Sequence, residues 1–255
     1  MCIIVVKCKG TDFAPKEVIA RCMKTNPHGF SMAWNRGGQI EVFRTMDPSE
    51  MMARYEQLTH ELDPRESAML FHARKATHGS CKVENTHCFT YGEPAVLAFC
   101  HNGILHNIKN RDDMTDSETF FRDLFIPAME GCGETFAYKM SKAIVETTGN
   151  KFAFLNKDGK VTFVTAEGVE FSKQQFPGLR GKIYFSNDGW RPVNAFGLDF
   201  NPYEGVAKSS DASLVKRGGS QLPSVGVRHR AAPGQPLRRL QSVDETLSFL
   251  MAQFK

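Results

Sequence analysis

The sequence predicts an α+β fold with largely antiparallel sheets, and three patterns lead to this prediction. Many short segments are rich in Val, Ile and Phe and have the length and composition of β-strands. A smaller number of helix-like segments is gathered between these strands, which is typical of the α+β class. Residues 156–159 (Asn-Lys-Asp-Gly) are a strong turn signal, so residues 151–166 should form a β-hairpin.

The remaining elements follow from the same patterns and from helix and turn signals. The expected strands are residues 2–8, 28–34, 38–44, 68–74, 96–101, 151–156, 160–166 and 182–186. The expected helices are residues 15–24, 48–60, 117–129 and 134–147. Pro15 and Pro48 begin two helices, since a first helical turn does not need the N–H that proline lacks. Residues 36–38 (Arg-Gly-Gly) supply a hairpin turn, and Thr115 with Glu118 forms a capping-box pattern.

The composition is that of an ordinary globular protein. The 255 residues, 41% hydrophobic and 24% charged, suffice for one large domain or for a domain with an extension. No apolar run approaches the roughly 20 residues that span a bilayer, and no basic segment precedes the short apolar run at the N-terminus. Seven cysteines, an odd number without an export signal, are typical of reduced thiols. We therefore expect a cytoplasmic protein without membrane association.

The character of the chain changes near residue 205. We expect a domain at 1–205, a basic linker or tail rich in Gly, Pro and Ser at 206–242, and a short C-terminal helix at 243–255. Between 206 and 240, seven basic side chains stand against one acidic side chain, a net charge of +6, whereas the whole chain carries +4. The simplest interpretation is a solvated linker, and the alternative is docking on an acidic partner or on nucleic acid.

The sequence predicts neither a metal site nor a cofactor. It contains no Cys-x-x-Cys pair and no His-Glu-x-x-His motif. Cys81 and Cys88, with His78 and His87 nearby, leave a zinc site open, although zinc sites usually have tighter spacing between paired ligands. No Gly-rich phosphate-binding loop is present, so an ATP-using activity would belong to another chain.

Cys2 is the candidate nucleophile. If Met1 is removed, this one residue carries both a thiol and a free α-amine, the N-terminal form of a nucleophile with its own base. An α-amine has an ordinary pKa of about 7.7–8.0, so a useful fraction is neutral near pH 7 and can accept the thiol proton. The alternative is that Cys2 is a small buried residue in an edge strand.

Asn102 and Gly103 are candidate oxyanion donors because they follow the apolar run 95–100. The side-chain amide of Asn102 and the backbone N–H of Gly103 could converge on one developing oxyanion, and glycine permits that close approach. The alternative is a simple Asn-Gly turn after a strand.

Arg74 and Asp116 are candidate groups for binding a charged substrate. Arg74 ends the strand 68–74, where its guanidinium could hold a carboxylate by two parallel hydrogen bonds. Asp116 lies at the expected start of a helix and could face a ligand ammonium. The alternatives are a surface salt bridge for Arg74 and helix capping in the segment that contains Asp116.

In order and spacing, these motifs resemble those of the class II glutamine amidotransferases, most of all the compact stand-alone members. The matching segments are Cys2, 74–79 (Arg-Lys-Ala-Thr-His-Gly), 84–89 (Glu-Asn-Thr-His-Cys-Phe), 101–103 (His-Asn-Gly) and 116–118 (Asp-Ser-Glu). The resemblance covers roughly residues 2–200 and implies the N-terminal-nucleophile hydrolase fold, a four-layer αββα sandwich. His28 and Cys88 stand where those members usually carry Asp and Pro.

The resemblance also implies a role for each site residue. The catalytic residues would be Cys2 as nucleophile with Asn102 and Gly103 as the oxyanion hole. The substrate-binding residues would be Thr77, His78 and Gly79 in a closing loop, Arg74 on the α-carboxylate of glutamine, and Asp116 on its α-ammonium. A zwitterionic amino-acid head requires one fixed cation and one fixed anion, so the charges of Arg74 and Asp116 agree with these roles.

The leading interpretation is a glutaminase that releases ammonia from glutamine through a γ-glutamyl thioester. We expect a separate acceptor enzyme to use the ammonia, because the residues after 200 are too few for a phosphoribosyl, sugar-isomerase or ATP-dependent synthetase domain. Two alternatives stay open: a γ-glutamyl amide hydrolase with no ammonia acceptor, and a catalytically silent binding module that uses the basic tail.

Overall fold

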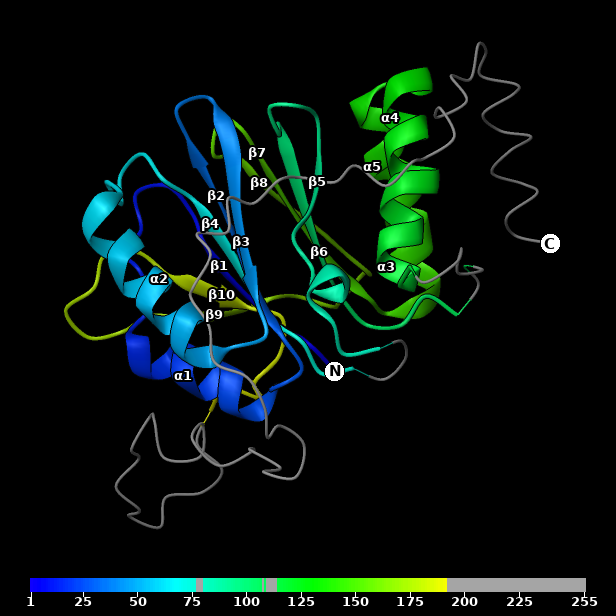
Figure 1. The fold of residues 1–255 in the computed structure, drawn as a ribbon. Helices are drawn as coiled ribbons and strands as arrows, with labels where there is room; N and C mark the ends of the chain where they lie inside the picture. Colours follow the sequence, from blue (N-terminus) through cyan, green and yellow to red (C-terminus); the bar gives the residue numbers. More distant parts are fainter. Residues whose placement is uncertain (77–79, 107, 109–113, 192–255) are drawn as a thin grey trace, which may run out of the picture.

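The protein, described by a computed structural model over residues 1–76, 80–106, 108 and 114–191, consists of two β-sheets packed face to face. One outer face is covered by α1 (Lys16–Thr25) and α2 (Pro48–Glu61). The other is covered by α3 (Asp116–Thr119), α4 (Ile126–Cys132) and α5 (Glu134–Thr148). Figure 1 shows these four layers, which confirm the predicted αββα sandwich.

All strand pairs are antiparallel, as the sequence predicts. The larger sheet has the order β3-β2-β4-β1-β10-β9. Its strands are β1 (Ile3–Lys7), β2 (Phe30–Arg36), β3 (Gln39–Thr45), β4 (Met69–Ala73), β9 (Ser172–Gln174) and β10 (Ile183–Phe185). The smaller sheet has the order β5-β6-β7-β8. Its strands are β5 (Phe89–Tyr91), β6 (Leu97–Asn102), β7 (Lys151–Asn156) and β8 (Val161–Thr165).

Both predicted hairpins are confirmed. Arg36 pairs with Gln39 across Gly37 and Gly38, whose φ angles of 58° and 76° suit a two-residue turn with positive φ at both positions. Strands β7 and β8 form the second hairpin around the turn at 156–159. Strands β5 and β9 were not expected from the sequence, because each has three residues and, unlike β10, lacks a continuous apolar run.

The third expected helix is interrupted by a wider turn. Between α3 and α4 the backbone forms η2 (Phe120–Phe125), a π-helical turn. It ends two residues before Pro127, which has no N–H to donate to the preceding turn. A separate 3₁₀ turn, η1 (Val83–Asn85), precedes β5.

Strand β1 is buried on both faces, and this explains its continuous apolar sequence. Ile3 and Val5 pack in the core under α1 and α2, whereas Ile4 and Val6 pack in the core between the sheets. Because β1 lies between β4 and β10, the interpretation of Cys2 as part of an edge strand is wrong. A third core, rich in phenylalanine, lies between the smaller sheet and α3–α5.

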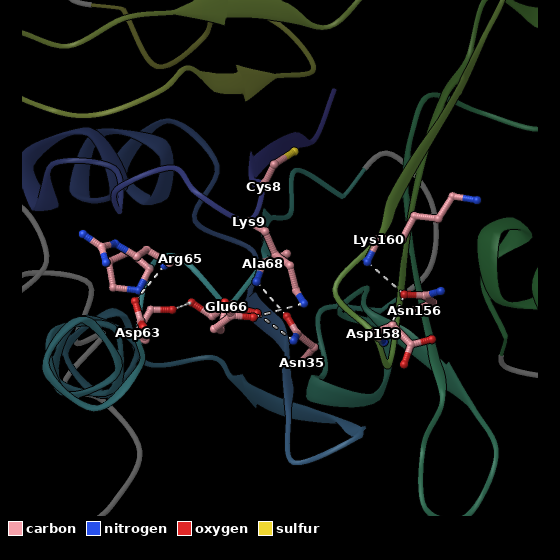
Figure 2. A network of polar contacts seen from close by, with 12 residues as sticks. Cys8, Lys9, Asn35, Asp63, Arg65, Glu66, Ala68, Asn156, Asp158 and Lys160 are labelled. Carbon is pink, nitrogen blue, oxygen red and sulfur yellow. Dashed lines mark hydrogen bonds and ion pairs between the residues drawn. The ribbon is translucent and has the colours of Figure 1, made fainter.

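Each sheet has its own group of polar contacts at the end of the sandwich where β1 stops (Figure 2). Asn35 Oδ1 accepts a 2.7 Å hydrogen bond from the Ala68 N–H, and Asn35 Nδ2 donates a 3.1 Å hydrogen bond to the Glu66 carbonyl. In the smaller sheet, Asn156 Oδ1 accepts from the N–H groups of Asp158 and Lys160 in the β7–β8 turn. We refer to this region as the far end.

Among the described residues, no helix combines the length and apolar character needed to cross a membrane. The predicted boundary at 205, the linker at 206–242 and the helix at 243–255 lie outside the described residues, as do Thr77, His78 and Gly79.

Candidate active site

At the end of the sandwich opposite the far end, three strand boundaries and one helix start border a single pocket. Cys2 directly precedes β1, Arg74 follows β4, Gly103 follows β6, and Asp116 begins α3. The pocket has a volume of about 370 Å³. Its lining residues are Cys2, Arg74, Lys75, Ala76, His87, Gly103, Ile104, Leu105, His106, Ile108, Met114, Thr115, Asp116 and Ser117. The fold thus brings together four of the residues that the sequence singled out.

The Cys2 thiol is partly exposed at the pocket and is positioned by its backbone. The Cys2 carbonyl accepts a 2.6 Å hydrogen bond from the Asn187 side-chain amide, and Cys2 Sγ lies 3.9 Å from the Lys75 carbonyl oxygen. Burial raises the pKa of the Cys2 thiol, and the contact with the Lys75 backbone, the N-terminal charge and the Arg74 charge offset this only in part. The thiol is therefore protonated near neutral pH, so a base must remove its proton before it can act as a nucleophile.

Arg74 is a buried cation at the wall of the pocket. Its backbone is fixed by two hydrogen bonds, from the Arg74 N–H to the Gly29 carbonyl (2.9 Å) and from the His28 N–H to the Arg74 carbonyl (3.0 Å). Its guanidinium donates a 2.8 Å hydrogen bond to the Ser80 carbonyl. Because Arg74 is only 3% exposed, its interpretation as part of a surface salt bridge is wrong. Because the local dielectric constant is low in a buried position, the Arg74 charge interacts more strongly with nearby charges than it would in water.

Asp116 presents an ionised carboxylate to the same pocket. Its Oδ2 accepts a 2.8 Å hydrogen bond from the Leu105 N–H, and its Oδ1 accepts one of 2.8 Å from the Ser117 N–H. Burial alone would raise the pKa of the Asp116 carboxyl, but the His101 ring and these two N–H groups hold that pKa below its usual value. Thr115 caps the helix through a 3.2 Å bond from the Glu118 N–H. Capping and a ligand-facing Asp116 are thus compatible.

Gly103 and Asn102 differ in their relation to the pocket. Gly103 lines it, with φ at 147°, a backbone conformation that favours glycine. Asn102 is buried beside the pocket, and its Nδ2 donates a 2.9 Å hydrogen bond to Ser186 Oγ. Asn102 Oδ1 has no hydrogen-bond partner among the described residues. Ser186 engages one of the two N–H groups of the Asn102 amide, and Asn102 itself does not line the pocket.

Three buried histidines form a stack beside the pocket, and one of them, His87, lines it. The rings of His72 and His87 lie 4.0 Å apart at 17°, and those of His87 and His101 lie 6.1 Å apart at 9°. His101 Nδ1 is 2.7 Å from Ser117 Oγ. Burial lowers the pKa of all three rings, that of His72 to about 3, so the stack is neutral at physiological pH.

We expect this stack to make the protein sensitive to acid. Below pH 6.5 the unfolded chain protonates at His72, while the folded chain does so only near pH 3, so the free energy of unfolding falls as the pH drops through this window. The loss is about 1.4 kcal/mol per pH unit for each such histidine. Urea unfolding at pH 7, 6 and 5 should show a shallower pH slope for His72→Phe than for wild type. The control is His60→Gln on the exposed side of α2, and an unchanged slope in His72→Phe would contradict the expectation.

Among the described residues, no group of three or more His, Cys, Asp or Glu side chains is placed to hold a metal ion. Of the cysteines that left a zinc site open, Cys88 lies in the core with its Sγ 3.1 Å from Cys100 Sγ, and Cys81 is exposed.

Several residues that organise the site were not singled out from the sequence. Asn187 and Ser186 follow β10, and Asn150 precedes β7. Ser186 bonds to the Asn102 side chain, Asn150 to the Ile104 backbone and Asn187 to the Cys2 backbone. The bonded residues are 46 to 185 positions apart in the sequence. The only sequence signals were Gly149-Asn150, which marks a helix end, and Asn187-Asp188-Gly189, which marks a turn.

A family model described as "Glutamine amidotransferases class-II" matches residues 11–175, a stretch that contains Arg74, Asn102, Gly103 and Asp116 but not Cys2. A protein of Haemophilus influenzae named "Putative glutamine amidotransferase" is 33% identical over 91 residues. The alignment covers 34% of this chain and only 29% of that relative.

Two solved structures are similar at 15% sequence identity. One is a glutamine aminotransferase class-II domain protein from Silicibacter pomeroyi, with a TM-score of 0.39 over 72% of this chain and 88% of that one. The other is the glutamine phosphoribosylpyrophosphate amidotransferase from B. subtilis, with a TM-score of 0.46 over 73% of this chain and 42% of that one.

Proposed function

Because the chain belongs to the class II glutamine amidotransferase family, we propose that it releases ammonia from glutamine through a γ-glutamyl thioester on Cys2. The observation that carries the proposal is the pocket itself, which combines a thiol, a buried guanidinium and an ionised carboxylate. These are the groups needed to attack an amide and to hold a zwitterionic amino acid.

The charges around the pocket support glutamine as the substrate. Arg74 would bind the α-carboxylate and Asp116 the α-ammonium, which fixes the amino-acid head and leaves the side-chain amide to reach Cys2. The Arg74 guanidinium donates to a backbone carbonyl, and the Asp116 carboxylate accepts from two backbone N–H groups. Their positions therefore require little reorganisation when the substrate binds.

The first chemical step uses both groups of Cys2. Once Met1 has been removed, the α-amine takes the thiol proton, and Sγ attacks the γ-carbonyl carbon of glutamine. The backbone N–H of Gly103 and the second N–H of the Asn102 amide would stabilise the resulting oxyanion. When the carbon–nitrogen bond breaks, the α-ammonium returns its proton to the leaving nitrogen, and ammonia is released.

The second step regenerates the thiol. The α-amine takes a proton from water, the hydroxide attacks the thioester, and glutamate leaves with the Cys2 sulfur protonated again. The ammonia would then be used by a separate acceptor enzyme. Replacing glutamine by another γ-glutamyl amide changes only the leaving amine, so the same site could hydrolyse such amides without an acceptor.

Three measurements on one preparation test the proposal. Intact mass reports whether Met1 is absent, ammonia and glutamate assays report turnover of glutamine, and acid quenching followed by mass analysis reports a γ-glutamyl adduct on Cys2. We expect all three to be positive. An active preparation that retains Met1 on every molecule would rule out the mechanism, and faster turnover of γ-glutamyl amides would assign the chain to the amide-hydrolase alternative.

Arg74→Lys and Asp116→Asn should chiefly weaken substrate recognition. Lysine keeps the charge but loses the paired N–H groups, and asparagine loses the negative charge, so we expect KM for glutamine to rise roughly tenfold or more. Steady-state kinetics measure the effect, with Arg36→Lys on the exposed end of β2 as control. Unchanged KM in both pocket variants would show that the substrate does not carry a zwitterionic head.

A further inference from the structure

Asn150 is a buried polar residue that lies next to the proposed oxyanion hole and has no role in the proposed chemistry. It follows Gly149, which ends α5 in the left-handed conformation, and directly precedes β7. The residue is 3% exposed, and its side chain bonds to the chain segment after β6. A buried amide in such a position is costly unless both of its polar atoms are satisfied.

Both polar atoms of Asn150 bond to one residue of that segment. Asn150 Oδ1 accepts a 2.8 Å hydrogen bond from the Ile104 N–H, and Asn150 Nδ2 donates a 2.9 Å hydrogen bond to the Ile104 carbonyl. The amide thus replaces the pairing that a neighbouring strand would supply. Gly103 lies so close that a Cβ on it would overlap Asn150 Oδ1.

The pairing between β6 and β7 explains why such a support is needed. The ladder ends with Asn102 opposite Lys151. Beyond Asn102 the chain leaves the sheet, so the direction of the Gly103 N–H is not set by strand pairing. It is set by how the peptide groups on either side are held, and Asn150 holds the following residue at both its N–H and its carbonyl.

We propose that Asn150 is a positioning residue that aims the Gly103 N–H at the oxyanion of the tetrahedral intermediate. This inference rests on the proposed function. Asn150 does not touch the substrate, because both of its polar atoms are bonded to Ile104. It acts through Gly103, by fixing the peptide that follows.

The expected kinetic signature of Asn150→Ala is a lower kcat with little change in KM. Losing an oxyanion donor outright costs about 10²–10³ in kcat. A donor that is present but poorly aimed should cost less, so we expect a decrease of roughly 10- to 100-fold. KM for glutamine should change less than about threefold, because Arg74 and Asp116 remain in place. The rate of Cys2 alkylation by iodoacetamide should stay within about twofold of wild type, since alkylation forms no oxyanion.

Asn150→Asp supplies a conservative variant with a distinct readout. Its carboxyl can still accept from the Ile104 N–H, but when ionised it places a second acceptor against the Ile104 carbonyl. Protonation turns that oxygen into a donor and restores the pairing. The ratio of its kcat to that of wild type should therefore rise as the pH falls. The buried His101 ring is a titratable group that faces Asn150, so the pH profile of Asn150→Ala serves as the reference for any change that comes from His101.

The far end offers a matched control. Asn35 also bonds with both amide atoms to a neighbouring backbone segment, through the Ala68 N–H and the Glu66 carbonyl (Figure 2). Asn35→Ala therefore removes the same two kinds of hydrogen bond at a distance from the pocket. It should lower the melting temperature and leave kcat within about twofold of wild type.

The outcomes separate this inference from the function on which it rests. A wild type that turns over neither glutamine nor a γ-glutamyl amide overturns the proposed function, and the positioning role with it. An active wild type whose Asn150→Ala variant keeps kcat within twofold, or loses kcat only as much as Asn35→Ala does, overturns the positioning role alone. So does a tenfold rise in KM without a fall in kcat.

Discussion

Cys2→Ala is expected to abolish glutamine hydrolysis while leaving the fold intact. The variant removes the atom that forms the thioester, so turnover should fall by at least about a thousandfold. The fold should tolerate the change, because the thiol is only partly buried and Cys2 is held chiefly by its backbone carbonyl. Cys2→Ser should retain a trace of activity, since a hydroxyl is a poorer nucleophile than a thiol.

Steady-state ammonia release and thermal unfolding test this expectation together. Cys132→Ala is the matched control, because Cys132 is also a partly exposed thiol but ends α4 and does not line the pocket. We expect near-wild-type activity and stability for the control. Comparable activity in Cys2→Ala would mean that the nucleophile is another residue.

Gly103→Ala is expected to lose both stability and activity. Its φ of 147° is unfavourable for a residue with a side chain, and the added methyl would overlap Asn150 Oδ1 and lie 3.0 Å from His101 Nε2. Backbone strain costs about 1–3 kcal/mol and overpacking about as much again. We therefore expect the free energy of unfolding to fall by about 2–6 kcal/mol in urea titrations. Turnover should fall by about 100-fold or more, because the N–H is displaced.

Two further variants isolate the cause. Gly133→Ala also has a positive φ, 87°, but its Cβ would meet no atom within 4 Å, so it should show only the backbone strain. Adding Asn150→Ala to Gly103→Ala removes the overlap and should recover part of the stability without recovering activity. If Gly103→Ala is no less stable than Gly133→Ala, close packing against Asn150 does not limit the side chain at position 103.

The sequence predicts those site residues that stand beside strongly patterned elements. Arg74 ends an apolar strand and Asp116 follows a helix-capping threonine, so each is placed by a local signal. The antiparallel layers could be predicted for the same reason, because long strands and helices carry their period in a short window.

The supporting residues could not be predicted, because their roles depend on which distant segments meet. Ser186 bonds to Asn102 across 84 residues, and Asn187 bonds to Cys2 across 185 residues. Before the fold is known, each is an ordinary polar residue after a strand. The same reason applies to β9, whose three residues form a strand only because β10 lies beside them.

The separation of the two ends of the sandwich has a practical consequence for handling the protein. The β7–β8 turn lies at the far end, and the side chain of Asp158 in that turn is 67% exposed. A dye or a surface tether attached at this position would stand a full strand length from the pocket mouth. Immobilised protein would then present its pocket to the solution, and a label there would report tumbling without competing for the substrate.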